Sequence, residues 1–201
     1  MEIKNSITSI LGRADIYLID QIMKGRYVQG NKILDAGCGG GRNMYWFVQN
    51  DFDIYGTDWS EAAILNLKKE YANLPAENLQ VCLVEKMPFA NDFFDHVISS
   101  AVLHFANNQQ HFKEMLGEMV RVLKPGGSLF IRMTSDIGIE DKVKLLSNGN
   151  HKIPDGSMRF LLTKLLLAAC MKEFNLSFLE PLKTVNVNDQ RCMSTLMLLK
   201  N

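Results

Sequence analysis

A glycine-rich segment carries the first residues whose types and spacing suggest chemistry. It runs Asp35-Ala36-Gly37-Cys38-Gly39-Gly40-Gly41-Arg42-Asn43, directly after a short apolar run. Between a strand and a helix, glycines let the backbone approach a ligand and direct N–H groups at it. Asp58 follows about twenty residues after Gly37, where an acidic side chain accepts hydrogen bonds from both hydroxyls of a ribose. Together these residues predict a site for a ribose-containing ligand.

Two ribose-containing cofactors compete for this site. A dinucleotide site has the pattern G-x-G-x-x-G, in which the third glycine allows a helix and a strand to pack closely. Counted from Gly37, that third position holds Arg42, which is large and charged. The carboxylate of Asp35 would repel a pyrophosphate, but it suits the ammonium group of a methionyl moiety. These residues favour S-adenosylmethionine, while a nicotinamide cofactor and a loop that serves only as a tight turn stay open as alternatives.

The elements that must position these residues alternate between short strand-like runs and amphipathic segments. This alternation is typical of a mostly parallel sheet with crossover helices. The expected strands are 32–36, 53–57, 79–84, 95–100 and 128–133, and the expected helices between them are 42–50, 60–71 and 107–123. Ser60 is the expected N-cap of its helix. The run Lys124-Pro125-Gly126-Gly127 is expected to end the third helix and turn the chain into the fifth strand.

The C-terminal third shows a different pattern. Residues 134–156 form a long stretch dotted with Gly, Asn and Asp, with one helical turn expected near 140–146, and such stretches are usually lids or binding segments. Residues 157–174 are apolar on nearly all sides and predict a buried helix. The strand-like runs 176–187 and 192–200 are separated by too few residues for a parallel crossover, so they must form an antiparallel hairpin.

These elements predict a three-layer α/β sandwich of the Rossmann-like class. Its sheet has seven strands in the order 3-2-1-4-5-7-6 and is mostly parallel, with the last strand antiparallel. The chain of 201 residues is expected to be a single domain. Residues 1–30 would form an N-terminal helical cover, and residues 134–156 a lid or substrate segment.

Composition excludes several classes of function. Lys+Arg and Asp+Glu number 22 each, and this zero net charge argues against binding a nucleic-acid backbone as the main function. The four cysteines are scattered without metal-ligand spacing, so neither a disulfide framework nor a metal site is expected. No apolar stretch is long enough to cross a bilayer, and no signal peptide is recognisable. We expect a cytoplasmic protein with no membrane partner, and the sequence does not predict its oligomeric state.

Four motifs, in order and at normal spacing, resemble those of class I S-adenosylmethionine-dependent methyltransferases. ILDAGCGGGRN is similar to the first motif of the family and YGTDWS to the second. MPFANDFFDHVISSAVLHF is similar to the stretch around the fourth strand, and EMVRVLKPGGSLFI to the run into the fifth. The resemblance covers about Asn31 to Met133 by motif, and the closing hairpin by topology. The GCGxGRN form is also similar to the tellurite-resistance-type branch.

The resemblance implies a role for each matching residue. Asp35 would act on the methionyl amine of S-adenosylmethionine, directly or through water, Asp58 would hold the ribose, and Trp59 would pack beside the adenine. The backbone positions implied near the methionyl and ribose groups are Gly37, Gly39, Gly41, Ser100 and Ala101. All of them lie at the carboxyl ends of strands, where open α/β sheets bind ligands.

One stretch departs from the family pattern. Many members have an acidic residue after the third strand, in a turn that contacts the adenine amino group. Leu83 stands at that point here, followed by Val84. Either Glu85 takes over the contact, or backbone donors and apolar contacts from Leu83 and Val84 hold the adenine.

His104 is the candidate general base, because it lies just beyond the fourth strand on the ligand side of the sheet. A loop or capping histidine that is satisfied by the backbone is the alternative. Methyl transfer from a sulfonium mainly requires alignment, and a base is needed only when the nucleophile must lose a proton. His111 and His151 are expected to be exposed.

Three further residues have two interpretations each. Tyr17, in an expected helix at 13–24 that would cover the cofactor, either contacts ligand or packs. Arg159 and Arg191 either bind an anionic substrate or are solvated surface residues.

The expected activity is therefore S-adenosylmethionine-dependent methyl transfer to a small-molecule acceptor by in-line displacement. A catalytically silent cofactor-binding or interaction module and an NAD-dependent oxidoreductase are the alternatives from other classes.

Overall fold

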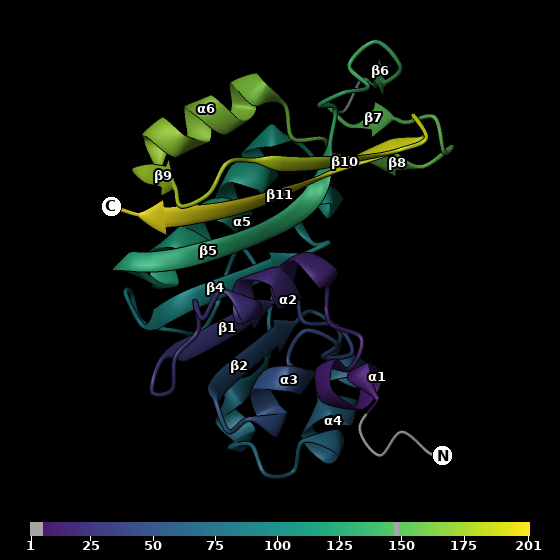
Figure 1. Ribbon diagram of the computed structural model, residues 1–201. Coiled ribbons are helices and arrows are strands. Elements are labelled where there is room, and N and C mark those ends of the chain that lie inside the picture. The colour runs from purple at the N-terminus through teal and green to yellow at the C-terminus, as the bar shows by residue number, and fades with distance from the viewer. Residues whose placement is uncertain (1–5, 147–148) are drawn as a thin grey trace.

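The computed structural model describes residues 6–146 and 149–201, and a mixed eight-stranded sheet forms its centre (Figure 1). Strands follow the path β3-β2-β1-β4-β5-β11-β10, and β9 pairs with β11 beside that path. Their bounds are β1 Lys32–Ala36, β2 Asp53–Asp58, β3 Leu79–Val81, β4 Phe94–Ser100, β5 Leu123–Ser135, β9 Leu176–Phe178, β10 Lys183–Val187 and β11 Arg191–Lys200. The first five strands pair in parallel, and β11 is antiparallel to β5.

The predicted fold class and strand path are confirmed, with one difference in the sixth strand. The expected strand 176–187 is divided into β9 and β10. Pro181 lies between the two pieces, and proline has no N–H to donate to a strand ladder. Both pieces pair antiparallel with β11, as the short connection requires.

Helices cover both faces of the sheet. Their bounds are α1 Ile7–Leu11, α2 Ile16–Met23, α3 Tyr45–Gln49, α4 Glu61–Glu70, α5 Gln109–Val122 and α6 Lys164–Glu173, with 3₁₀ helices η1 Ala76–Asn78 and η2 Leu103–Phe105. Successive strand residues point to opposite faces. Ile33 and Ile98 pack with α2, α3 and α4, whereas their neighbours Leu34 and Val97 pack with α5 and α6. The strands are therefore apolar on both faces, as expected between two helical layers.

Local signals explain most helix boundaries. Ser60 caps α4 as predicted, since its hydroxyl oxygen accepts the Ala63 N–H at 3.3 Å. Helix α3 starts three residues later than predicted, because Arg42 to Met44 belong to the turn after the glycines. Strand β5 begins at Leu123, directly after α5, so the Lys124–Gly127 run lies within that strand rather than before it.

Two predictions in the C-terminal third are wrong. The helical turn expected at 140–146 is absent from these described residues, which form turns and the short strand β6, Lys144–Leu145. Together with β7, His151–Lys152, and β8, Met158–Arg159, it builds a small antiparallel sheet beyond the end of β5 (Figure 1). Residues 147–148 of the predicted segment 134–156 lie outside the described residues.

The helix predicted at 157–174 starts only at Lys164. The Thr163 hydroxyl oxygen accepts the Leu166 N–H at 3.0 Å and caps α6, while the residues before it pair in β8. Leu165 is 86% exposed, so the helix is not buried on all sides as predicted. Among the helices of residues 6–146 and 149–201, none has the length and apolar character that crossing a membrane requires.

Candidate active site

Three neighbouring cavities lie at the carboxyl ends of the parallel strands. The first, of about 280 Å³, lies between the segments that follow β2, β3 and β4. The second, of about 770 Å³, lies along the glycine loop. The third, of about 260 Å³, lies between η2, β5, β8 and the start of β11. Ala101 lines all three, and His104 lines the second and third, so the cavities meet at these two residues.

The glycine loop is held against the end of β2. The N–H groups of Gly37 and Cys38 both donate to the Thr57 carbonyl, at 2.8 Å each. Gly37 has a φ of +77°, and a Cβ there would lie 2.6 Å from a methyl carbon of Val102, so only glycine fits. At Gly39 a Cβ would meet no heavy atom within 4 Å, because this part of the loop faces the second cavity.

Asp58 connects this loop to the first cavity. Its Oδ2 accepts the Gly39 N–H at 2.8 Å, and its Oδ1 accepts the Ser60 N–H at 2.9 Å. The residue is only 7% exposed but lines the first cavity. Each carboxylate oxygen has further acceptor capacity, so both can still accept from ligand hydroxyls.

Asp35 lies deeper, at 1% exposure. Neither of its carboxylate oxygens has a hydrogen-bond partner in the described part of the chain. Burial raises the pKa of Asp35 to about 7, against the lowering effect of Arg42, and Asp58 raises it further. Asp35 does not appear among the residues that line the three cavities. A buried carboxyl without a partner is costly, and a bound ammonium group or a bridging water would supply the missing donor.

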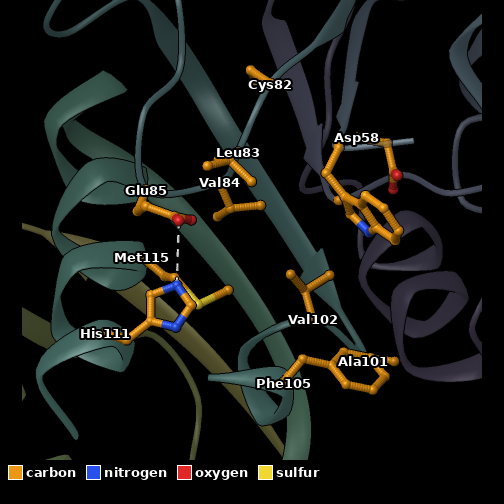
Figure 2. Close-up of a pocket in the computed structure, with 12 residues that line it drawn as sticks. Asp58, Cys82, Leu83, Val84, Glu85, Ala101, Val102, Phe105, His111 and Met115 are labelled. Atoms are coloured by element: carbon orange, nitrogen blue, oxygen red, sulfur yellow. Dashed lines mark ion pairs between the residues drawn. The ribbon is translucent and has the colours of Figure 1, made fainter. Parts of the chain in front are cut away.

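The first cavity has an apolar lining and one ion pair (Figure 2). Leu83 and Val84 follow β3 and line it, together with Trp59, which is 76% exposed. Glu85 Oε1 lies 3.3 Å from His111 Nε2 on one side of the same cavity. Glu85 is therefore present where the sequence left an acidic contact open.

His111 is a site residue that the sequence reasoning missed, and the expectation of an exposed side chain was wrong. Its side chain is half-buried and lines the first cavity. Its Nδ1 accepts the Asn107 N–H at 3.1 Å, so Nε2 is the nitrogen that faces Glu85. The sequence feature that could have revealed it is its position in the first turn of α5, because this helix starts at the edge of the sheet where ligands bind.

His104 stands where the second and third cavities meet. It is 7% exposed, and its Nδ1 has no hydrogen-bond partner among the described residues. Burial lowers the pKa of His104 to about 4, and the nearby Arg159 contributes in the same direction. The imidazole is therefore neutral at physiological pH, and its Nδ1 can donate or accept a hydrogen bond to a ligand.

An ionic cluster anchors α2 over the second cavity, and Asp15 is its centre. The Ser100 hydroxyl donates to Asp15 Oδ2 at 3.0 Å and accepts from Arg42 at 3.2 Å. The guanidinium groups of Arg42 and Arg132 lie 3.7 and 3.4 Å from the same Oδ2. The Asp15 N–H donates to the Asn43 side chain at 2.9 Å. Sequence reasoning missed Asp15, which is visible only as an N-cap of the covering helix.

Of the remaining candidate residues, one packs against the protein and two line the third cavity. The Tyr17 ring packs against the Arg132 guanidinium at 5.0 Å and does not line the three cavities. Arg159 and Arg191 both line the third cavity. His151 lies in β7 and is half-buried, so the expectation that it is exposed was wrong.

Known proteins match this chain over the segment that carries the motifs. Residues 34–131 match the family model of a methyltransferase domain. An uncharacterized methyltransferase of Synechocystis sp. is 35% identical over 98 residues, which cover 49% of this chain and 44% of that protein. A tRNA (carboxymethyluridine(34)-5-O)-methyltransferase of Arabidopsis thaliana is 33% identical over 102 residues, covering 51% of this chain and 24% of that protein.

A phthiotriol/phenolphthiotriol dimycocerosates methyltransferase of Mycobacterium leprae is 33% identical over 119 residues, covering 58% of this chain and 43% of that protein. The matched part of the chain thus spans less than half the length of these curated relatives.

Solved structures share the fold over nearly the whole chain. A SAM-dependent methyltransferase from Methanosarcina mazei has a TM-score of 0.70 at 18% identity, covering 89% of this chain and 96% of that one. The Burkholderia thailandensis 1,6-didemethyltoxoflavin-N1-methyltransferase, with bound 1,6-didemethyltoxoflavin and S-adenosylhomocysteine, has a TM-score of 0.65 at 16% identity, covering 91% and 75%. Motifs, relatives and fold agree: this chain carries a class I S-adenosylmethionine-dependent methyltransferase domain.

Proposed function

We propose that this protein transfers a methyl group from S-adenosylmethionine to a small-molecule acceptor. The observation that carries the proposal is the meeting of the cavities at Ala101 and His104. Apart from Asp35, which is buried beneath them, the residues expected to hold the cofactor line the first and second cavities, and the third is a separate space of about 260 Å³. Residues 1–201 would act as one domain, with the N-terminal helices covering the cofactor.

The residues present fit S-adenosylmethionine. Asp58 would accept the ribose hydroxyls, since it lines the first cavity and each of its oxygens can accept a further hydrogen bond. Asp35 would hold the methionyl ammonium, directly or through water, because its two carboxylate oxygens have no other partner in the described chain. Gly37, Gly39 and Gly41 would bring backbone to the methionyl and ribose groups.

The adenine would lie in the first cavity. Trp59, Leu83 and Val84 supply its apolar contacts, and Glu85 would accept from the adenine amino group. Backbone groups of Ser100 and Ala101 would lie near the methionyl end, because both residues line the second cavity.

The chemistry asks little of the protein beyond alignment. S-adenosylmethionine supplies a methyl carbon already activated by its positive sulfur. The nucleophile would donate an electron pair to that carbon, and the carbon–sulfur electron pair would stay on sulfur. His104 would take a proton from the nucleophile where it carries one. Holding the nucleophile in line at the junction can supply much of the rate acceleration.

A small acceptor fits this chain better than an RNA. The third cavity, of about 260 Å³, lies just below the usual range for small-molecule sites, about 300–1,000 Å³, so it would hold only a small compound or one small group of a larger compound. The sequence has equal numbers of basic and acidic residues, 22 each, whereas RNA-binding surfaces usually carry a basic excess.

The test has a binding arm and a turnover arm. Calorimetric titration is expected to show binding of S-adenosylmethionine and S-adenosylhomocysteine, and no binding of NADH. Formation of S-adenosylhomocysteine is then followed with a metabolite extract below 1 kDa and, separately, with a tRNA mixture. Turnover with the small-molecule fraction supports the proposal.

Three outcomes would contradict it. Binding of NADH alone would favour an oxidoreductase. Turnover with tRNA alone would replace the acceptor class. Cofactor binding without turnover on either fraction would favour a silent binding module.

A further inference from the structure

We propose that the acceptor is a small organic anion, whose carboxylate or phosphate group is held by Arg159 and Arg191 in the third cavity. This inference rests on the proposed methyltransferase function and deepens it.

The third cavity has more basic than acidic side chains in its lining. Its lining includes three arginines, Arg132, Arg159 and Arg191, and one carboxylate, that of Asp155. His104 adds no charge, because burial lowers its pKa to about 4. The lining therefore has an excess of positive charge, although the chain as a whole has none.

The three arginines differ in whether a carboxylate of the protein pairs with them. Arg132 lies 3.4 Å from Asp15, so its charge belongs to the cluster that anchors α2. Neither Arg159 nor Arg191 is within ion-pair distance of a described carboxylate. The nearest opposing charge is that of Asp155, whose Oδ1 accepts from the N–H and hydroxyl of Ser157 at 2.9 and 2.7 Å. These hydrogen bonds lower the pKa of Asp155, and Arg191 and Arg159 lower it further, so one carboxylate is shared between two guanidinium groups. Two guanidinium groups thus face the cavity without an ion-pair partner among the described residues.

The fold builds this arrangement from distant parts of the chain. Arg159 lies in β8 and Arg191 at the start of β11. The Phe160 N–H donates to the His104 carbonyl at 3.1 Å, which places β8 beside the proposed base. The Asp155 N–H donates to the Gln190 carbonyl at 3.2 Å and joins the small sheet to the β10–β11 turn. Both arginines are therefore held at one cavity by backbone hydrogen bonds near them.

The same contacts orient an acceptor towards the methyl group. Arg159 stacks over the Phe105 ring at 5.2 Å, and Phe105 also lines both cofactor-side cavities. An anion held by the arginines would share the third cavity with His104, which also lines the second cavity. Planar guanidinium groups bind carboxylate and phosphate groups in two-point contacts, which gives orientation as well as affinity. The negative charge would also offset the effect of Arg159 and raise the pKa of His104.

Anion binding is tested on protein saturated with S-adenosylhomocysteine. Benzoate, phenyl phosphate and the neutral benzamide are titrated by ligand-observed NMR. We expect at least one of the two anions to bind, and benzamide to bind more weakly. The benzoate and phenyl phosphate arms distinguish a carboxylate from a phosphate acceptor.

The variants are Arg159→Gln and Arg191→Gln, with Lys152→Gln as the matched control. Lys152 is an exposed cation of the same small sheet and does not line the cavity. Each arginine variant is expected to weaken anion binding about tenfold, as for loss of a charge-assisted hydrogen bond. The control is expected to bind the anion as the unchanged protein does.

Several results would overturn the inference. Benzamide could bind as tightly as the anions, or neither anion could bind at millimolar concentration. The Lys152→Gln variant could lose as much anion affinity as the arginine variants, or a tRNA mixture could displace the anion. The affinity for S-adenosylhomocysteine is measured in parallel for every variant. If the unchanged protein does not bind S-adenosylhomocysteine, the proposed function is contradicted. If it binds S-adenosylhomocysteine normally but binds neither anion, only this inference is contradicted.

Discussion

Gly39 donates its backbone N–H to Asp58 Oδ2 across 2.8 Å, so the glycine loop and the acidic residue of the second strand form one hydrogen-bonded unit. The contact turns the carboxylate into part of the loop's support as well as a candidate ribose ligand.

Replacing Asp58 by Ala is expected to weaken S-adenosylhomocysteine binding by about 10- to 100-fold, the usual effect of losing hydrogen bonds to a charged group. The Gly39 N–H also loses its acceptor. Calorimetric titration measures the loss. Asp53→Ala, at the opposite end of β2, is the control and should bind normally. Unchanged affinity in Asp58→Ala would show that the ribose lies elsewhere.

Stability should depend on pH through Asp35. In the folded chain its pKa is raised to about 7, whereas in the unfolded chain it lies near 3.8. Between these values the folded state binds more protons, so the free energy of unfolding falls as pH rises from about 4 to about 7. At 1.36 kcal/mol per pKa unit the total is about 4 kcal/mol. Asp35→Asn is expected to lose this dependence and to exceed the unchanged protein in stability at pH 8, as measured by urea unfolding.

Ligand binding should reverse this protonation. An ammonium group beside Asp35 favours the carboxylate, so S-adenosylhomocysteine binding at pH 6 is expected to release protons from this residue. Calorimetry in buffers of different ionisation enthalpy detects the release. If Asp35→Asn releases as many protons as the unchanged protein, Asp35 is not the group that meets the ammonium.

Glu85 is expected to recognise the adenine amino group. In Glu85→Ala, the preference for S-adenosylhomocysteine over its inosine analogue should fall about tenfold, because the analogue lacks the donor. The ratio of the two dissociation constants isolates this contact from general loosening. Glu77→Ala, an exposed acid in η1, should keep the preference. A preference that survives in Glu85→Ala would leave backbone donors as the adenine contact.

His104→Gln is expected to keep S-adenosylhomocysteine affinity and to lose turnover. A general base contributes about 10²–10⁴-fold, and a pKa near 4 makes His104 a weak base, so we expect a loss near the lower end of that range. Single-turnover rates with a saturating acceptor measure it. An unchanged rate would make His104 a lining residue without a proton-transfer role.

Thr163 caps the start of α6, so replacing it is expected to lower the stability of the fold and to leave ligand binding unchanged. Thr163→Ala removes the oxygen that accepts the Leu166 N–H, at an expected cost of about 1 kcal/mol. In a chain of this size that lowers the melting temperature by about 2–4 °C. Thr163→Ser keeps the acceptor oxygen and should melt close to the unchanged protein. Equal losses in the two variants would point to the methyl group of Thr163 instead of the cap.

The meeting of the glycine loop and Asp58 at one sheet edge was predictable from sequence, because it depends on neighbouring elements. Gly37 follows β1 and Asp58 ends β2, and these strands are adjacent and parallel, so both residues come to one sheet edge. The strand 32–36 matches β1, and the cap at Ser60 was confirmed, since both depend on neighbouring residues. The prediction that the helix starts at residue 157 was wrong, because the apolar pattern begins before the residue that caps the helix, Thr163.

The proposed acceptor cavity arises only in the tertiary structure. Arg159 and Arg191 are separated by the whole of α6 and two strands, and hydrogen bonds from the small sheet to η2 and the β10–β11 turn bring them to one cavity. Whether Arg159 is a solvated side chain or a ligand for an anion depends on that assembly. The isolation of Asp35 is likewise a consequence of packing, because burial, which raises its pKa, is created by all the layers around it. Residue type and spacing determine which groups can react, while charge balance and burial arise from contacts between segments that the sequence leaves far apart.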